Sequence, residues 1–354
     1  MVTVCAMRPT LRNKDKHVPR TQDVALSVKN LKTYFYTNNR CNKAVNGVSF
    51  EIRKGKTLCI VGESGCGKSV TASTIMQLLP ALSRIEQGQV TYHSDSGDVH
   101  IEKLQRDGKE MRAIRGSEIA MIFQDPMTAL NPVYTIGFQI GESLKYHTDL
   151  STKEIREKTI DLLRGMGISL PEMRVDDYPH SYSGGMRQRA MIAMAMSCNP
   201  KILIADEPTT ALDVTIQSQI FELMDKLKAE NETAIMLITH DMGVVAELAD
   251  DVAVMYMGNI VEAGTVDQVL RHPVHPYTRA LLKSIPVLGR GRNQDIQPIA
   301  GSTPDPYDRP IGCQFAPRCK HRIEACDVMP QEVTFNGTQR VMCWRYKEFL
   351  PDAG

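Results

Sequence analysis

The stretch Gly62-Glu63-Ser64-Gly65-Cys66-Gly67-Lys68-Ser69 reads G-x-x-x-x-G-K-S. It follows an apolar run from Thr57 to Val61 and precedes the segment from Val70 to Leu79, which has the composition of a helix. A strand, this loop and a helix, in that order, form the context in which the motif binds the phosphates of a nucleotide. The glycines allow successive backbone N–H groups to point at an anion at the N-terminal end of the helix. The stretch therefore predicts an α/β fold with a phosphate-binding loop.

Two adjacent carboxylates complete the chemistry that such a loop needs. Asp206 and Glu207 end the apolar run that starts at Lys201. Because side chains alternate in direction along a strand, one carboxylate can serve a metal ion while the other faces the attacking water. We expect Lys68 to reach the outer phosphates and Ser69 to bind Mg²⁺. These residues predict a nucleotide hydrolase, whereas a chance glycine turn would not explain the strand, the helix and the acidic strand end together.

A second glycine-containing motif narrows the class. Ser183-Gly184-Gly185 lies just before the apolar run Ala190 to Cys198, where the serine can cap a helix and the glycines expose backbone N–H groups. Here the chain resembles the ATP-binding cassette family, whose signature is L-S-G-G-Q; Tyr182 and Met186 take its first and last places. The resemblance implies that this motif binds the γ-phosphate of a nucleotide held by an opposite subunit. Without this placement, Ser-Gly-Gly would indicate only a surface turn.

The resemblance also implies roles for residues that would otherwise count as ordinary loop or strand positions. Gln124 matches the glutamine that senses Mg²⁺ and the attacking water and touches the transmembrane partner. Asp213 matches the residue that crosses the dimer interface, and His240 matches the histidine that contacts the γ-phosphate.

An aromatic residue near the start of the chain completes the family pattern. Phe35 best matches the side chain that stacks on adenine, and Tyr34 and Tyr36 remain alternatives. The predicted nucleotide-binding residues are Phe35, Gly62, Glu63, Ser64, Gly65, Cys66, Gly67, Lys68, Ser69, Val70, Gln124, Ser183, Gly184, Gly185, Asp206, Asp213 and His240. The predicted catalytic residues are Glu207, His240, Lys68 and Gln124, and the predicted Mg²⁺ ligands are Ser69, Gln124 and Asp206.

Length and charge agree with two domains, or with one large domain and a smaller appended region. The chain has 354 residues and a net charge of +1, which gives no signal for binding a nucleic acid. It contains no run of eighteen apolar residues, so the sequence predicts no membrane-spanning helix. Residues 1–22 lack the apolar segment of a secretory signal and are expected to form a flexible, weakly basic tail.

The patterns along the chain predict its organisation. Alternation over Val45 to Ile52 predicts a strand, and the segment Ser94 to Asp98 predicts a hairpin turn. Helical spacing over Lys153 to Met166 predicts a helix. Further along, apolar strands alternate with helices such as Val214 to Ala229, as expected for a parallel sheet covered on both faces. The resemblance implies an ABC ATPase domain at 23–272, with a RecA-like core, an antiparallel β subdomain and an α-helical subdomain at about 125–182, followed by a C-terminal region at 273–354.

Four stretches make the resemblance more specific. Phe123–Pro132, Tyr182–Arg189, Leu203–Val214 and His272–Thr278 look like the ATP-binding subunit of bacterial dipeptide and oligopeptide importers, and Pro306–Pro310 favours the dipeptide-permease group. The likeness covers about residues 24–345. It implies an ATPase that powers peptide uptake across the bacterial cytoplasmic membrane. Nickel, haem, opines and glutathione are alternative cargoes, because the group also includes importers of these.

The same resemblance implies partners. They are a second ABC ATPase subunit, expected as a heterodimer with a sister cassette, two transmembrane permease subunits and an extracytoplasmic peptide-binding protein. The chain would then lie peripherally at the cytoplasmic face of the inner membrane. A soluble cassette ATPase that acts on ribosomes or DNA is the rival interpretation, but such relatives carry two cassettes or long coiled coils. An exporter, the second rival, would have fused membrane helices.

Cysteines cluster near the end of the chain. Cys313, Cys319, Cys326 and Cys343 account for four of its nine cysteines and follow the spacing C-x5-C-x6-C-x16-C. Four thiolates suit a [4Fe-4S] cluster or tetrahedral Zn²⁺, and the peptide-importer resemblance favours the cluster. Reduced, unligated thiols are the third interpretation, while disulfides do not suit a reducing compartment. We also expect Cys66, in the phosphate loop, to make the ATPase sensitive to thiol reagents.

Overall fold

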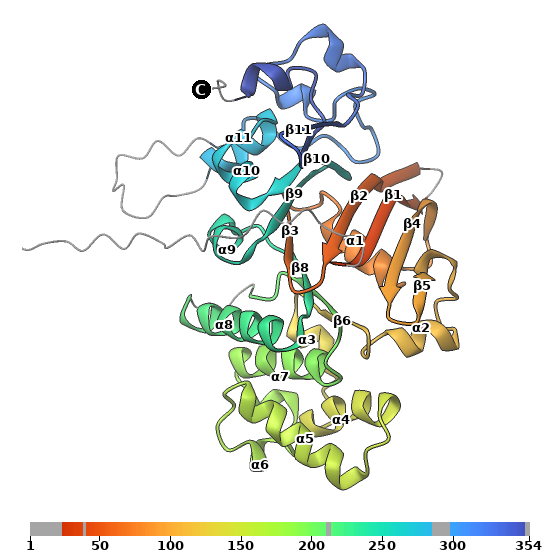
Figure 1. Ribbon diagram of the computed structural model, residues 1–354, viewed down its shortest axis with the longest axis vertical. Helices are drawn as coiled ribbons and strands as arrows, with labels where there is room; N and C mark the ends of the chain where they lie inside the picture. The colour runs from red at the N-terminus through yellow and green to blue at the C-terminus, as the bar shows by residue number, and fades with distance from the viewer. Residues whose placement is uncertain (1–22, 38–39, 210–213, 285–297, 351–354) are drawn as a thin grey trace, which may run out of the picture.

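Two β-sheets and a group of helices form the protein (Figure 1). The computed structural model describes residues 23–37, 40–209, 214–284 and 298–350. The smaller sheet is antiparallel, with the strand order β2-β1-β4-β5. Its strands are β1 (Val24–Thr37), β2 (Arg40–Arg53), β4 (Ser83–Ser94) and β5 (Gly97–His100).

The antiparallel sheet confirms two sequence predictions. Ser94 pairs with Gly97 across the turn between β4 and β5, which is the predicted hairpin. Along β2, Val48, Phe50 and Ile52 are buried while the residues between them are more exposed. This alternation places one face of the sheet against the core.

The larger sheet has eight strands in the order β11-β12-β10-β9-β3-β8-β7-β6. Its strands are β3 (Thr57–Val61), β6 (Ile119–Ile122), β7 (Ile202–Asp206), β8 (Ala234–Ile238), β9 (Asp251–Tyr256), β10 (Asn259–Thr265), β11 (Val333–Phe335) and β12 (Gln339–Val341). The five strands from β9 to β6 run parallel. Every residue of β3, β7 and β8 is buried, as expected for parallel strands covered on both faces.

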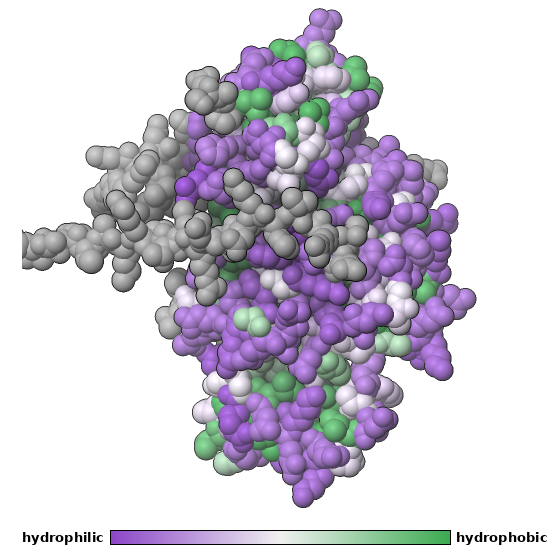
Figure 2. Space-filling view, viewed as in Figure 1, coloured by the Kyte–Doolittle hydropathy of each residue, from purple (hydrophilic) through white to green (hydrophobic). Residues whose placement is uncertain are grey.

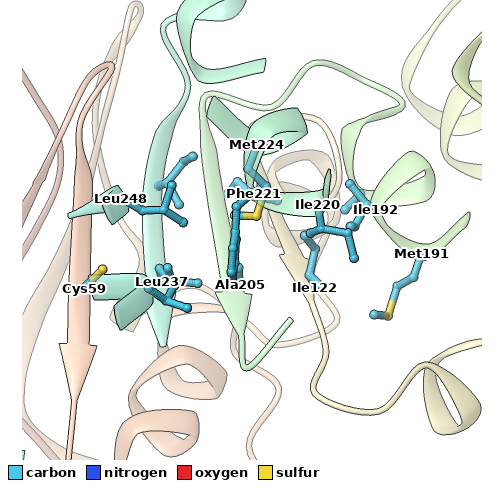
Figure 3. Close-up of a cluster of buried hydrophobic side chains, with 14 of the residues drawn as sticks. Cys59, Ile122, Met191, Ile192, Ala205, Ile220, Phe221, Met224, Leu237 and Leu248 are labelled. Atoms are coloured by element: carbon cyan, nitrogen blue, oxygen red, sulfur yellow. The ribbon is translucent and has the colours of Figure 1, made fainter. Parts of the chain in front are cut away.

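Helices cover the two faces of the parallel strands. Cys59 on β3 faces α8 (Val214–Asn231) and α9 (Met242–Leu248), and Figure 3 shows it in line with Leu237, Ala205 and Ile122 from the neighbouring strands. On the opposite face, Ile60 packs with α1 (Lys68–Ile75) and with the antiparallel sheet. Alternate residues of the same strand therefore serve two cores.

The first helix is shorter than predicted. It begins at Lys68 and ends at Ile75, whereas the composition suggested a helix from Val70 to Leu79. Gln77 has a φ of 51°, which lies in the left-handed region and cannot continue a helix. Pro80 then follows before β4 begins.

A helical subdomain projects from the sheet edge that ends in β6, at the bottom of Figure 1. It contains α3 (Pro126–Ala129), α4 (Ile136–His147), α5 (Thr152–Gly165), α6 (Pro171–Arg174) and α7 (Gly184–Met196). Helix α5 confirms the helix predicted from Lys153 to Met166. Its N-terminus has a full capping box, in which Ser151 and Glu154 exchange hydrogen bonds.

The C-terminal part of the chain lies at the opposite end (Figure 1). It contains α10 (Val266–Arg271), α11 (Pro276–Lys283), β11 and β12, and β12 pairs with β10 so that the main sheet continues into it. The remaining elements are α2 (Lys109–Ile114) and 3-10 helices at Ile101–Lys103, Pro179–Ser181, Ala316–Arg318, Glu324–Asp327 and Tyr346–Phe349. Among the described helices, none is long and apolar enough to span a lipid bilayer.

Candidate functional site

The loop between β3 and α1 adopts a conformation that depends on its glycines. Gly62, Gly65 and Gly67 have φ values of 155°, 78° and 106°, which side chains rarely tolerate. A Cβ atom on Gly67 would lie 2.2 Å from the carbonyl oxygen of Ala44. Lys68 is 5% exposed, and its ammonium donates to the carbonyl oxygens of Gly62 at 2.8 Å and of Glu63 at 3.1 Å. The loop is therefore closed around the side chain that is predicted to bind phosphate.

Two oxygen ligands for a cation meet next to this loop. The Ser69 hydroxyl donates to Asp206 Oδ1 at 3.0 Å, across the 137 residues that separate them in the sequence. Burial raises the pKa of the Asp206 carboxyl, and the hydrogen bond from Ser69 opposes this shift. A serine hydroxyl and a carboxylate are the oxygen donors that Mg²⁺ prefers. The residues present therefore fit the predicted Mg²⁺ site.

Glu207 is held between two side chains from neighbouring strands. Its carboxylate accepts a hydrogen bond of 2.9 Å from Gln124 Nε2, and His240 Nδ1 lies 3.3 Å from its other oxygen. Gln124 follows β6 and His240 follows β8, on either side of β7. Parallel strands bring their carboxyl ends to one edge of the sheet, so residues from three distant segments meet here.

One cleft connects this cluster to the antiparallel sheet. It is lined by Phe35, Thr37, Asn42, Ala44, Ser64, Gly65, Gly67, Lys68, Ser69, Val70, Gln124, Glu207 and Tyr307. Of the three aromatic candidates, only Phe35 lines this cleft. The hydroxyl of Tyr34 donates to Asn46 at 2.9 Å, and that of Tyr36 donates to Glu86 at 2.7 Å. The geometry favours Phe35 as the residue next to a nucleobase.

The signature motif does not line this cleft. Ser183 caps α7, because its hydroxyl accepts a hydrogen bond of 3.3 Å from the backbone N–H of Met186. Ser183 and Gly184 are exposed to solvent. Asp213, the last predicted site residue, lies outside the described residues.

Comparison with known proteins identifies the family. Residues 45–210 match the family described as ABC transporter, and residues 261–326 match the one described as oligopeptide/dipeptide transporter, C-terminal region. The chain is 49% identical to the dipeptide transport ATP-binding protein DppD of Bacillus subtilis, over 90% of this chain and 94% of that protein. The chain belongs to the ATP-binding subunits of peptide ABC transporters.

Other members and solved structures agree with this assignment. The ABC subunit is 48% identical to the oligopeptide transport ATP-binding protein AppD of Bacillus subtilis, over 91% of this chain and 97% of that protein. Its fold resembles a dimeric post-hydrolysis state of the ATP-binding cassette MJ0796 bound to ADP and Pi. That match has a TM-score of 0.60 and 27% identity, and it covers 68% of this chain and 98% of the cassette. These likenesses confirm the predicted ABC-type P-loop fold and the ATPase class.

Tyr307 is a cleft residue of this ABC subunit that the motifs missed. It comes from the C-terminal part of the chain and lines the same cleft as Phe35. The guanidinium of Arg40 lies 5.6 Å from the centre of its ring. The only sequence signal was the segment Pro306–Pro310, whose prolines restrict the backbone on both sides of the tyrosine without indicating what it faces.

The four C-terminal cysteines converge on one small cavity, called the thiol cavity from here on. Burial raises the pKa of the Cys313 thiol to about 11 and that of the Cys343 thiol to about 12. Cys326 is buried, and its backbone carbonyl accepts a hydrogen bond of 2.9 Å from the N–H of Cys313. Within the described parts of the chain, however, no three His, Cys, Asp or Glu side chains are arranged to hold a metal ion. The four cysteines line one cavity, but their side chains are not arranged as metal ligands.

Cys66 lies in a different environment from the one that the sequence suggested. It is 4% exposed, and burial raises the pKa of its thiol. A thiol must be both accessible and ionised to react with an alkylating reagent. The expected sensitivity of the ATPase to thiol reagents through Cys66 does not fit this buried position.

Proposed function

We propose that this chain is the ATP-hydrolysing subunit of an importer that takes up dipeptides or oligopeptides across the bacterial cytoplasmic membrane. The observation that carries the ATPase role is Glu207, held between Gln124 and His240 at the cleft that contains Lys68. The match of residues 261–326 to the oligopeptide and dipeptide transporters supports the peptide cargo. Within this proposal, residues 23–272 form the ATPase domain and residues 273–354 form the C-terminal region.

The geometry supports a specific division of labour during hydrolysis. Glu207 accepts a proton from the attacking water, whose oxygen forms a bond to the γ-phosphorus while the bond to the ADP oxygen breaks. Gln124 and His240 hold the carboxylate in place, and Lys68 stabilises the charge on the phosphate oxygens. Ser69 and Asp206, which are hydrogen-bonded to each other, together with Gln124 would hold Mg²⁺, which would supply further positive charge to those oxygens.

The exposed signature motif supports a second ATPase subunit. Ser183, Gly184 and Gly185 lie at the N-terminus of a thirteen-residue helix, where Ser183 and Gly184 are exposed, and they do not line the cleft of their own chain. A nucleotide in that cleft would meet such a motif only from another cassette. We propose a heterodimer with a sister cassette, because peptide importers of this kind often use two different ATPases. Two of the solved structures that this chain resembles are described as dimeric.

The helical subdomain carries an apolar surface that suits a permease subunit. Tyr134 and Phe138 stack with ring centres 4.7 Å apart and are 46% and 52% exposed. Figure 2 shows hydrophobic residues, in green, gathered over this subdomain at the bottom of the view. Other exposed apolar residues of the subdomain are Met127, Val133, Tyr146, Leu170, Met173 and Tyr178. Such a surface supports docking of permease subunits, with the chain peripheral to the cytoplasmic face of the membrane.

For the thiol cavity we propose a [4Fe-4S] cluster held by Cys313, Cys319, Cys326 and Cys343. The convergence of all four thiols on one cavity supports it. Such a cluster would supply a structural cross-link between the segments that carry the four cysteines, because hydrolysis needs no electrons. Iron, acid-labile sulfide and zinc should be measured in protein purified without oxygen. Four iron atoms per chain support the cluster; zinc alone, or neither metal, contradicts it.

The cargo is tested by uptake. Cells that carry either the normal chain or Glu207→Gln as the only copy are given a labelled dipeptide, a labelled longer peptide and nickel. Loss of peptide uptake alone in the variant is the expected result. Loss of nickel uptake alone would assign a metal cargo and contradict the proposal, as would retention of all three.

A further inference from the structure

Glu63, in the phosphate loop, is bound through its backbone N–H and its carboxylate by residues that are far away in the sequence. Its backbone N–H donates to the hydroxyl of Tyr277 at 2.9 Å, and its carboxylate accepts two hydrogen bonds from Arg318, at 2.6 and 3.1 Å. Its carbonyl oxygen accepts a hydrogen bond from Lys68. One loop residue thus connects the phosphate-binding lysine to the C-terminal part of the chain.

Arg318 is well placed to hold Glu63 rigidly. Its side chain is 5% exposed. The rings of Tyr256 and Phe315 lie beside it, with ring centres 5.9 and 6.0 Å from the guanidinium carbon. It also donates to the carbonyl oxygen of Ala300 at 3.1 Å. The paired carboxylate raises the pKa of Arg318 further above its ordinary value. Glu63 is half-buried, and a partly buried, bidentate pair of this kind is less screened than a fully exposed salt bridge.

Tyr277 holds the loop backbone from the same side. It is fully buried, and its ring packs against Tyr256 and Phe315 with ring centres 4.6 and 5.4 Å away. Because the ring cannot move without disturbing this cluster, its hydroxyl is a fixed acceptor for the Glu63 N–H. Arg318 ends the 3-10 helix Ala316–Arg318, which lies in the chain between Phe315 and Cys319, two residues that line the thiol cavity.

We propose that Arg318 is a positioning residue for nucleotide binding, which acts by holding Glu63 so that the phosphate loop is ordered before ATP arrives. The N–H groups of such a loop bind phosphate only when they point inward together. Ordering the loop in advance lowers the conformational cost of binding. The inference rests on the proposed ATPase function and gives the C-terminal part of the chain a role in it.

The test is the Kd of MgATP, measured directly, and the KM and kcat of hydrolysis. Arg318→Met should weaken MgATP binding by about tenfold, which corresponds to about 1.4 kcal/mol. KM should rise by a similar factor, while kcat changes less. Arg318→Lys, which keeps the charge but loses the bidentate geometry, should lie between Arg318→Met and the normal chain. Arg322→Met is the matched control, since Arg322 forms an exposed pair with Asp327 at 2.7 Å in the same region.

A double-mutant cycle separates positioning from general stability. If Arg318 acts through Glu63, then adding Arg318→Met to Glu63→Gln should change the Kd little beyond the Glu63→Gln value. If each substitution raises the Kd by its own factor and the two factors multiply in the double variant, Arg318 does not act through Glu63 and the inference is overturned. An unchanged Kd in Arg318→Met would also overturn it. Should Arg318→Met fail to fold, Arg318→Lys in the two Glu63 backgrounds decides the question in the same way. Failure of the normal chain to bind MgATP would instead contradict the proposed function.

Discussion

Glu207 has a backbone φ of 46°, a conformation that is strained for any residue with a side chain. It directly follows the last residue of β7, and its N–H donates to the carbonyl oxygen of Ile238 at 2.9 Å. This turn separates Glu207 from Asp206, so that one carboxylate meets Ser69 and the other meets Gln124. Strain of this kind persists where the surrounding contacts compensate for it, and here it is located at the proposed general base.

At the residue scale, Glu207→Gln tests that assignment. The amide cannot accept the proton, so ATP turnover should fall by about 100- to 10,000-fold. Binding of MgATP should stay within about threefold, because Lys68, Ser69 and the loop N–H groups are unchanged. Phosphate release and equilibrium binding measure the two effects. Near-normal turnover would show that another group takes the proton.

Cys66 gives a second prediction at the same scale, with a defined pH dependence. Burial raises its thiol pKa, so the reactive thiolate is scarce at neutral pH and becomes more abundant as the pH rises. Alkylation of Cys66 in the folded protein should therefore be slow near pH 7 and faster at higher pH. Mass spectrometry of the labelled peptide measures the rate, with Cys41, which is half-buried, as the internal comparison. Rapid labelling of Cys66 at pH 7 would contradict this prediction.

At the scale of elements, two helical glycines of the helical subdomain differ in their surroundings. A Cβ on Gly137 in α4 would lie 2.4 Å from Val175 Cγ2, whereas a Cβ on Gly165 in α5 would have no atom within 4 Å. Gly137→Ala should therefore destabilise the protein by about 1–3 kcal/mol. Gly165→Ala should be neutral or stabilising by up to about 1 kcal/mol. Denaturant unfolding measures both, and equal effects would show that the α4 contact is unimportant.

The elements themselves were largely predictable because their signals are local. The cap at Ser183 and the buried apolar runs of β3, β7 and β8 can each be recognised within a few residues of sequence. The end of α1 could not be predicted, because the left-handed residue that ends it, Gln77, is neither a glycine nor a proline. Strand β12 joins the main sheet only through pairing with β10, about 80 residues earlier. Three residues are too few to show the alternation that predicts a strand, so this pairing could not be predicted from the sequence.

At the scale of the whole molecule, the apolar surface of the helical subdomain predicts how the ATPase meets its permease. Phe138→Ser should leave ATP hydrolysis by the isolated subunit unchanged, because Phe138 is 52% exposed and does not line the nucleotide cleft. It should reduce co-purification with the permease subunits. Leu82→Ser is the matched control, since Leu82 is 61% exposed but lies beside the antiparallel sheet. If Phe138→Ser co-purifies with the permease subunits as well as the normal chain does, the docking surface lies elsewhere.

The sequence by itself determined the fold class, the ATPase chemistry and the family, because each phosphate-binding motif is a short continuous stretch whose geometry is local. Only the tertiary structure decided which aromatic residue lines the cleft. The pairing register of β1 with β2 shifts between Thr33 and Phe35, and such an irregularity breaks the alternation that would otherwise tell the two sheet faces apart.

The tertiary structure also decided what the end of the chain contributes. Arg318 and Glu63 are separated by 255 residues, and Tyr307 reaches the cleft from an equally distant segment. A pair at such a separation leaves no periodic or spacing signal in one sequence, because neither partner affects the local structure of the other. Their meeting is set by the packing of the C-terminal part around Tyr256, Tyr277 and Phe315, and only the folded chain shows it.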